Sequence, residues 1–290
     1  MNIALPPEFS FKECLHYLGR SPRELLHRVE GGAVYKLIGH ENEKTLFKVS
    51  SSGLGLVVDF PIAEPGEEVK KEVEQYIINW FDLDKDLKPF YEMAARDPLL
   101  SGLVERHYGY RIVGQPDLYE SLVWAVLGQQ INLGFAYALK QRFVKEYGKK
   151  LVFEGNEYFL FPGPGIVATV AMEDLLKIQF SRQKARYTIG ISEAFLDGTV
   201  SKQKLAGLPL VEAKEKLMKI KGIGNWTANY ALMKTFRFPD AFPLEDAGLG
   251  NALRSLLHLH GKPTLDEVRE VFRPYKGWEA YATLYLWRAL

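Results

Sequence analysis

Two helical segments joined by a glycine-containing turn constrain this fold more than any other feature of the chain. The stretch 211–236 reads VEAKEKLMKIKGIGNWTANYALMKTF. Apolar residues recur at the spacing of one buried helical face on both sides of the turn: Ala213, Leu217 and Ile220 before it, and Trp226, Tyr230 and Met233 after it. Gly222 and Gly224 permit a tight reversal, which Ile223 would fix by pointing inward. The sequence therefore predicts a helical hairpin.

The turn of this hairpin has two interpretations. A helix start beside two glycines exposes backbone N–H groups, which is an arrangement that binds anions, and Lys219, Lys221 and Lys234 are close in sequence. On the glycines alone, an ordinary hairpin with a glycine-rich turn is the simpler interpretation. A dinucleotide-binding loop is not favoured, because no strand precedes Gly222 and the third glycine of that motif is missing.

The other segments divide into a short part with strands and a longer helical part. Three runs between turn residues predict an antiparallel meander: AVYKLIGH (33–40), TLFKVS (45–50) and LGLVVDF (54–60), with a turn at HENEK (40–44). A helix is predicted over 67–81, and the acidic stretch 82–89 then predicts a domain boundary. The class is α+β, with a small N-terminal antiparallel-sheet domain followed by a larger, mostly α-helical part.

Helical spacing dominates the second part of the chain. Helices are predicted near 90–108, 117–147, 171–196, 210–220, 225–236, 247–260, 264–273 and 278–288. Asp117 and Thr264 are predicted N-caps, and Glu267 completes a capping box with Thr264. FPGPG (161–165) predicts a rigid loop.

Composition and charge limit the kinds of cofactor and binding partner that the chain can have. Cys14 is the single cysteine, which excludes an intrachain disulfide, a cysteine zinc site and a four-cysteine iron–sulfur cluster. Residues 1–110 carry 13 Lys and Arg against 18 Asp and Glu, whereas residues 111–290 carry 24 against 18, so a polyanion would bind the second part. The chain shows no signal-peptide pattern and no apolar run near the ~20 residues of a membrane span. We therefore expect a cytoplasmic protein.

The stretch IKGIGNWTANYALM (220–233) resembles the helix-hairpin-helix motif of the DNA glycosylase superfamily, in which an aspartate follows the hairpin by about twenty residues. Here Asp246 stands twenty residues after Trp226. The similarity to the bacterial inducible 3-methyladenine DNA glycosylases of type II extends over 127–139, 161–200 and 278–287. It implies a two-lobed glycosylase core after the N-terminal domain. The implied division is an N-terminal domain over 1–90, a helical lobe formed by 91–116 and 239–290, and a hairpin lobe over 117–238.

The resemblance assigns the chemistry to Asp246. The residue type and position also fit a plain helix N-cap, and the two roles are compatible, because an N-cap holds the carboxylate at the positive end of the helix dipole. Cleavage of a glycosidic bond builds positive charge on the sugar, which a carboxylate stabilises. Asp246 is the predicted catalytic residue.

The resemblance also implies a pocket for a flipped base and a side chain that fills the gap in the helix. Trp226, Tyr230 and Trp278 are the predicted pocket, although aromatic residues on helices more often pack in a core. An indole face attracts a cationic methylated purine. Gln130 is the predicted wedge, with Ile131 as the alternative; the related glycosylases carry an apolar residue there, so this chain departs from them.

Contacts with the DNA backbone are assigned to the hairpin residues Lys221, Gly222, Ile223 and Gly224. The resemblance further implies a Na⁺ or K⁺ ion held by the carbonyls of Met218, Ile220 and Ile223, which would bridge the hairpin to a phosphate. The basic run Arg182, Lys184 and Arg186 is either a solvated face or a further phosphate contact.

The resemblance implies a monofunctional DNA glycosylase that removes alkylated purines, such as 3-methyladenine and 7-methylguanine, from duplex DNA. No cofactor for the chemistry, no membrane and no obligate protein partner is expected. Superfamily members that also cut the strand carry a lysine two residues after the second hairpin glycine, where this chain has Trp226. The alternatives are a non-catalytic protein that binds damaged DNA, a glycosylase/lyase for oxidised purines, and an unrelated helical interaction module.

Overall fold

The computed structural model describes residues 1–40 and 43–290. Its N-terminal layer is a five-stranded antiparallel sheet in the order β1-β5-β4-β3-β2. The strands are β1 (Asn2–Ile3), β2 (His27–Glu30), β3 (Ala33–His40), β4 (Glu43–Ser52) and β5 (Gly55–Asp59). The predicted meander is confirmed as β3, β4 and β5; the centre of the predicted HENEK turn, 41–42, lies outside the described residues. β1 and β2 were not predicted.

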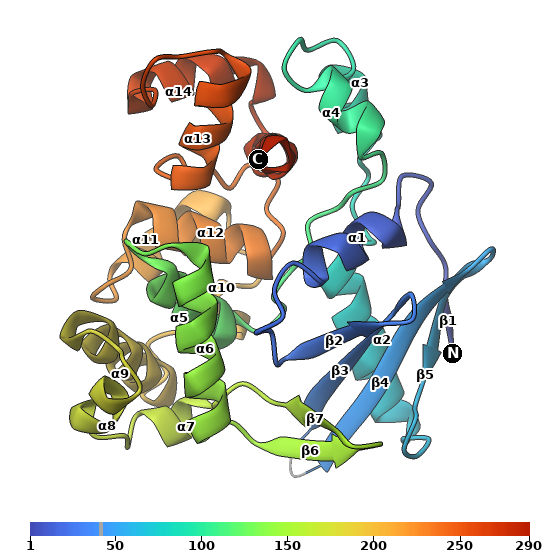
Figure 1. Cartoon of the computed structure of the whole chain (residues 1–290), viewed down its shortest axis with the longest axis vertical. Helices are drawn as coiled ribbons and strands as arrows, with labels where there is room; N and C mark the ends of the chain where they lie inside the picture. Colours follow the sequence, from blue (N-terminus) through green and yellow to red (C-terminus); the bar gives the residue numbers. More distant parts are fainter. Residues whose placement is uncertain (41–42) are drawn as a thin grey trace.

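Helix α2 (Glu67–Phe81) follows the sheet with the predicted bounds. It buries Val69, Val73 and Ile77 along one face, and the ring of Trp80 lies edge-on against that of Phe47 in β4. Helix α1 (Phe11–Leu18) is capped at its N-terminus by the side chain of Ser10. A second, unpredicted hairpin of β6 (Lys150–Phe153) and β7 (Asn156–Phe159) comes from the helical part but lies against β2 and β3 (Figure 1).

The helical part supplies the remaining elements. They are α3 (Lys88–Ala94), α4 (Ser101–Arg106), α5 (Leu118–Gly128), α6 (Leu133–Tyr147), α7 (Pro164–Val167), α8 (Met172–Lys177), α9 (Arg182–Leu196), α10 (Lys202–Leu205), α11 (Leu210–Met218), α12 (Asn225–Thr235), α13 (Ala247–Leu256), α14 (Leu265–Phe272) and α15 (Glu279–Leu286), with 3-10 turns η1 (Arg273–Tyr275) and η2 (Trp287–Ala289). Figure 1 shows α13 and α14 at one end, α8 and α9 at the other, and α11 and α12 between them. Among the described residues, no helix is long and apolar enough to cross a membrane.

Three predicted helices are divided in the structure, because the chain reverses within them and begins again at a new cap. The segment 90–108 forms α3 and α4, 117–147 forms α5 and α6, and 171–196 forms α8 and α9. Gln130 (φ 57°) ends the first half of 117–147, and Asn132 caps α6. The predicted caps Asp117 and Thr264 are confirmed. The predicted loop 161–165 is wrong at its end, where Pro164 starts α7, a position that suits proline.

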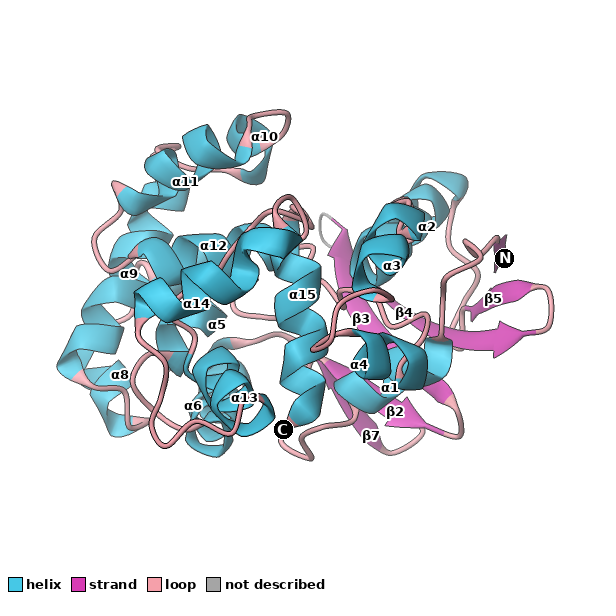
Figure 2. Cartoon of the chain, turned by 90° about the horizontal axis from the view of Figure 1, so that it is seen from above, coloured by secondary structure: helices cyan, strands magenta, loops and turns pink. Residues whose placement is uncertain are grey.

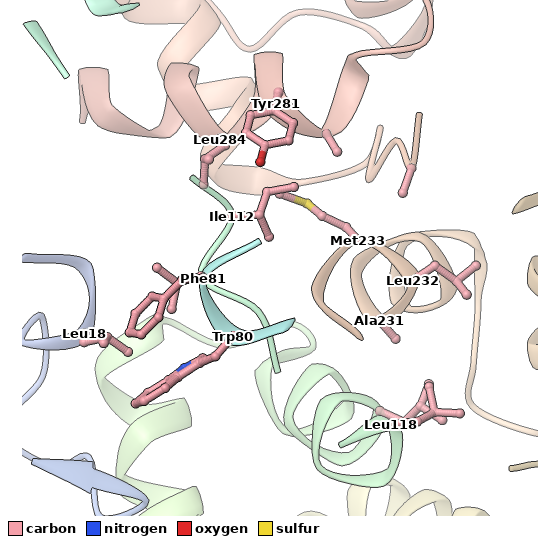
Figure 3. Close-up of a cluster of buried hydrophobic side chains, with 14 of the residues drawn as sticks. Leu18, Trp80, Phe81, Ile112, Leu118, Ala231, Leu232, Met233, Tyr281 and Leu284 are labelled. Atoms are coloured by element: carbon pink, nitrogen blue, oxygen red, sulfur yellow. The ribbon is translucent and has the colours of Figure 1, made fainter. Parts of the chain in front are cut away.

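One hydrophobic core joins the sheet layer to the helices. Figure 3 shows Trp80 and Phe81 at the end of α2 near Ile112, with Met233 of α12 and Tyr281 and Leu284 of α15 nearby; all six belong to one buried cluster. Figure 2 shows α15 between α12 and the sheet side of the molecule. Asp82, which opens the acidic stretch, is buried and accepts from Arg237 Nε at 2.9 Å. The N-terminal layer is therefore fixed to the helices that carry the site.

Candidate active site

Asp246 lies where three N–H donors converge. Its Oδ1 accepts from the backbone N–H of Leu249 at 2.7 Å, so the predicted N-cap of α13 is confirmed. Oδ1 also accepts from Trp287 Nε1 at 2.9 Å, and Oδ2 accepts from Trp226 Nε1 at 3.1 Å. Gly248 leaves room for this approach, since a Cβ there would lie 3.0 Å from Oδ1. A half-buried carboxylate is thus held in one orientation by two indoles and a helix N-terminus.

An aromatic cluster stands beside this carboxylate; it comprises Trp124, Tyr137, Trp226, Tyr230 and Trp287. The rings of Trp226 and Tyr230 stack with centroids 5.3 Å apart, and Trp124 Nε1 donates to Tyr230 Oη at 3.1 Å. Tyr230 is nearly buried, whereas Trp226 and Trp287 are half-buried. The cluster presents two partly open indoles next to Asp246.

The two tryptophans of the C-terminal stretch have different places. Trp278 lies at the start of α15, where its ring packs near Phe90 and Tyr281, with centroids 5.8 and 6.0 Å away. Trp287 lies at the other end of the helix and contacts Asp246. The structure therefore brings Trp287, which was not predicted, to the carboxylate, and it does not bring Trp278 there. The only sequence signal for Trp287 was its place in the quoted stretch 278–287.

The hairpin between α11 and α12 has the predicted form. Gly222 has φ +97°, and a Cβ there would lie 2.3 Å from the ring of Tyr187 in α9. Ile223 is buried, whereas Lys221 and Gly224 are exposed. Asn225 Nδ2 donates to Glu245 at 2.9 Å, which holds the start of α12 against the loop before Asp246.

Two lysines are buried, although the sequence placed Lys234 close to the hairpin and Lys184 either on a solvated face or at a phosphate. Lys234 lies at the end of α12 that is farther from the hairpin, where its Nζ donates to Tyr17 Oη. It therefore cannot bind an anion at the hairpin tip. Lys184 donates from Nζ to the carbonyls of Val126 and Gln129 at 3.1 and 2.6 Å. Burial lowers the pKa of Lys184 to about 8. Its neighbours in the basic run, Arg182 and Arg186, are exposed.

The loop between α5 and α6 carries the predicted wedge and is fastened to the hairpin. Gln129 Nε2 donates to the carbonyl of Gly222 and to Thr227 Oγ1, both at 3.0 Å. Gln130 is exposed at φ 57°, whereas Ile131 is half-buried and packs against the aromatic cluster. Of the two wedge candidates, Gln130 is the more exposed.

Among residues 1–40 and 43–290, no group of His, Cys, Asp and Glu side chains is arranged to hold a metal ion. The predicted cation carbonyls lie on the hairpin backbone. The carbonyl of Ile220 accepts from the N–H of Ile223 at 3.1 Å, whereas those of Met218 and Ile223 accept no hydrogen bond from the part of the chain that the structure describes. Two carbonyls with free lone pairs fit a monovalent cation.

Known proteins share this architecture. Residues 123–276 match the family model of the HhH-GPD superfamily base excision DNA repair proteins, and residues 8–122 match the 8-oxoguanine DNA glycosylase N-terminal domain. The chain is 43% identical to the DNA-3-methyladenine glycosylase of Bacillus subtilis over 99% of this chain and 96% of that one.

Solved structures show the same fold. The 3-methyladenine DNA-glycosylase from Archaeoglobus fulgidus has a TM-score of 0.85 at 22% identity, covering 99% of this chain and 97% of that one. The Clostridium acetobutylicum 8-oxoguanine glycosylase/lyase has a TM-score of 0.75 at 23% identity, covering 97% of this chain and 93% of that one.

Proposed function

This chain belongs to the HhH-GPD superfamily of base excision DNA repair proteins and is a DNA glycosylase of that family, and we propose that it releases alkylated purines from duplex DNA by hydrolysis, without cutting the strand. The observation that carries the proposal is the carboxylate of Asp246, held by the indoles of Trp226 and Trp287 and by the N–H of Leu249.

Asp246 stabilises the positive charge that develops on the sugar. A carboxylate about 4 Å from that charge, at an effective dielectric near 20, contributes about 4 kcal/mol, which is roughly a thousandfold in rate. The same carboxylate orients the attacking water. An alkylated purine already carries a positive charge, so it leaves without a second carboxyl group to protonate it. The hydrogen bonds to both oxygens keep Asp246 in place before the base arrives.

The base site follows from the aromatic cluster. Trp226 and Trp287 supply electron-rich faces, with Tyr230 stacked behind Trp226. Cationic purines such as 3-methyladenine and 7-methylguanine bind such faces more tightly than neutral ones do. The Bacillus subtilis relative is named for 3-methyladenine, which agrees with this class of substrate.

We predict that Trp226→Ala slows release of 7-methylguanine by about ten- to a hundredfold, because stacking contributes ~1–3 kcal/mol per base. Release of neutral hypoxanthine should fall less, and duplex affinity should change little. Trp226→Phe is the matched control, because it keeps an aromatic face but loses the donor to Oδ2. Single-turnover release of each base measures these effects. Equal losses on the charged and the neutral base would leave only the shape of the pocket as an explanation.

DNA backbone contacts are proposed for the hairpin tip, Lys221 to Gly224, of which Lys221 and Gly224 are exposed, with Gln130 filling the helix after the base has flipped. A Na⁺ or K⁺ ion on the carbonyls of Met218, Ile220 and Ile223 would neutralise a phosphate there. Binding to the DNA backbone through the hairpin is largely independent of base sequence and weakens as the salt concentration increases.

We expect the enzyme to act in the cytoplasm on chromosomal DNA, without an obligate protein partner.

A glycosylase/lyase for oxidised purines is the second candidate, because the N-terminal match and one similar structure belong to such enzymes. β-Elimination needs an amine that forms a Schiff base at the sugar C1′. The lyases of the superfamily carry their reactive lysine two residues after the second hairpin glycine, and this chain has Trp226 there, which donates to Asp246. The ammonium group of Lys184 already donates to two backbone carbonyls. A non-catalytic lesion-binding role does not explain why indole N–H groups hold both carboxylate oxygens of Asp246.

We predict that borohydride added during turnover on an alkylated duplex traps no protein–DNA adduct. The product strand should stay intact until alkali cleaves the abasic site. Electrophoresis of a labelled strand, with and without alkali, measures both results. A lyase of the same superfamily is the positive control for trapping. A trapped adduct would show that an amine of this chain reaches C1′, and the hydrolytic mechanism would be wrong.

A further inference from the structure

Lys184 is a buried lysine at the start of a helix. It lies in the first turn of α9, which Ser181 caps, and therefore at the positive end of that helix dipole, where a cation is disfavoured. Burial lowers the pKa of its ammonium group, and no carboxylate among residues 1–40 and 43–290 forms an ion pair with it. A buried charge of this kind costs stability unless its contacts compensate for it.

The contacts of Lys184 lie at the end of α5, against which α9 packs (Figure 1). Its Nζ donates to the carbonyl of Val126 at 3.1 Å and to that of Gln129 at 2.6 Å. These carbonyls stand at the negative end of α5, where a cation is favoured and where a helix lacks donors for its last carbonyls. Lys184 therefore fixes the point at which α5 ends and the wedge loop, residues 129–132, begins.

Gln130 is the second residue of the wedge loop, and its backbone is held by its neighbours. Its φ of 57° is left-handed, which is disfavoured for most residues other than glycine. Its side chain is exposed and forms no hydrogen bond with residues 1–40 and 43–290. The support comes instead from Lys184, on the carbonyl before Gln130, and from Asn132, which caps α6 after it. The conformation of Gln130 thus depends on Lys184.

The side chain of Gln129 ties the wedge loop to the hairpin. Its Nε2 donates to the carbonyl of Gly222 and to Thr227 Oγ1, both at 3.0 Å. Lys184 holds the main chain of the same residue from α9. The two arms of this clamp, Lys184 and the Gln129 side chain, set the position of Gln130 relative to the hairpin tip, which is proposed to hold the DNA backbone.

Resting on the proposed glycosylase function, we propose that Lys184 is a positioning residue for base flipping, which acts by holding Gln130 where it fills the gap that the flipped base leaves. A side chain in that gap opposes the return of the base. This help matters most for a paired lesion, because an unpaired base costs less to extrude. Loss of Lys184 therefore slows release of a paired base, whereas the chemistry at Asp246 is unchanged. Because the ammonium group is buried, it binds no phosphate itself.

The test places 7-methylguanine opposite cytosine in one duplex and opposite an abasic-site analogue in another, and measures its release under single-turnover conditions with enzyme in excess. Lys184→Met keeps the length of the side chain but loses its donors. Its rate constant should fall about tenfold or more on the paired lesion and less than about twofold on the unpaired one. The fluorescence of a 2-aminopurine next to the paired lesion, which rises on unstacking, should rise less with this variant than with the wild type.

Two further lysine variants serve as controls, and the ratio of paired to unpaired rate constants is compared in each. Lys184→Arg keeps donors for the two carbonyls and should recover part of the ratio. Lys150→Met replaces an exposed lysine of β6 that pairs with Glu157, and its ratio should equal that of the wild type.

A double variant distinguishes positioning from a general loss of stability. Gln130→Ala removes the wedge and should itself slow release of the paired lesion. Adding Lys184→Met should slow it little further, because the lysine acts through Gln130, whereas independent effects multiply. Multiplied effects would overturn the proposal, as would equal losses on the two duplexes for Lys184→Met, or a wild-type ratio for Gln130→Ala.

Gln129→Met decides the matter if Lys184→Met does not fold. It removes the other arm of the clamp and leaves Lys184 in the chain, so the ratio of paired to unpaired rate constants should again fall. An unchanged ratio would overturn the proposal. Failure of the wild type to release 7-methylguanine from either duplex would instead contradict the proposed function.

Discussion

Replacing Asp246 with Asn is expected to slow base release about a thousandfold or more while DNA affinity is retained. Asparagine keeps the size of the side chain and its oxygen can still cap α13, but the negative charge that faces the sugar is lost. Affinity can even rise, because no carboxylate repels the phosphates. Single-turnover rates and duplex binding, measured on the same lesion, separate the two effects.

The hydrogen bonds around Asp246 call for a specific control. Both carboxylate oxygens accept from indole N–H groups, so the amide nitrogen of an asparagine would face one of them, donor against donor. An unsatisfied, partly buried donor costs about 1–3 kcal/mol, and this cost is separate from the lost charge. The double variant Asp246→Asn with Trp226→Phe removes that conflict. Its rate should stay as low as that of the single variant; recovery to the rate of Trp226→Phe would contradict a role for the charge.

Replacing Gly222 with Ala should weaken binding to damaged and undamaged duplexes alike, by about tenfold or more. The new Cβ would lie 2.3 to 2.7 Å from three ring atoms of Tyr187, and the backbone has φ +97°, which alanine rarely adopts. The hairpin tip must therefore move, and the carbonyl that Gln129 binds moves with it. Fluorescence anisotropy with a labelled duplex at several salt concentrations measures the loss.

Two variants test whether the clash is the cause. Gly190→Ala adds the same methyl group to α9, where no atom lies within 4 Å, and should bind DNA like the wild type. Tyr187→Ala combined with Gly222→Ala removes the ring and should restore the part of the affinity lost to the clash, whereas the strain of an alanine at φ +97° remains. Normal DNA binding by Gly222→Ala alone would mean that the hairpin is not the anchor.

The sequence predicted the parts of the site that depend on local chemistry. Glycine spacing and helical periodicity identified the hairpin, and Asp246 was placed at a helix start by the residues around it. The sequence could not predict which side chains from distant elements contact Asp246. Nothing local distinguishes Trp287 from Trp278, since both flank α15; packing of α13 against the end of α15 decides which indole meets the carboxylate.

The burial of charged residues could not be predicted either, because it depends on contacts between elements that are distant in the sequence. Lys184 and Lys234 look like surface lysines in the sequence, but each is buried by a helix distant along the chain and bonded to oxygens there. Arg20 and Tyr137 lie 117 residues apart, so periodicity could not show that the end of α1 contacts α6. The division of 117–147 was missed because both halves have helical spacing, and only the caps reveal the break.

Free-base analysis of a methylated duplex tests the central claim most directly. Purified enzyme is incubated with the duplex, the released bases are separated by chromatography, and the DNA is examined for strand breaks before and after alkali. The hydrolytic mechanism centred on Asp246 predicts free 3-methyladenine and 7-methylguanine, together with strands that break only after alkali. Binding to the duplex without any released base, or release of 8-oxoguanine with strand cleavage from an oxidised duplex but no alkylated base, would contradict it.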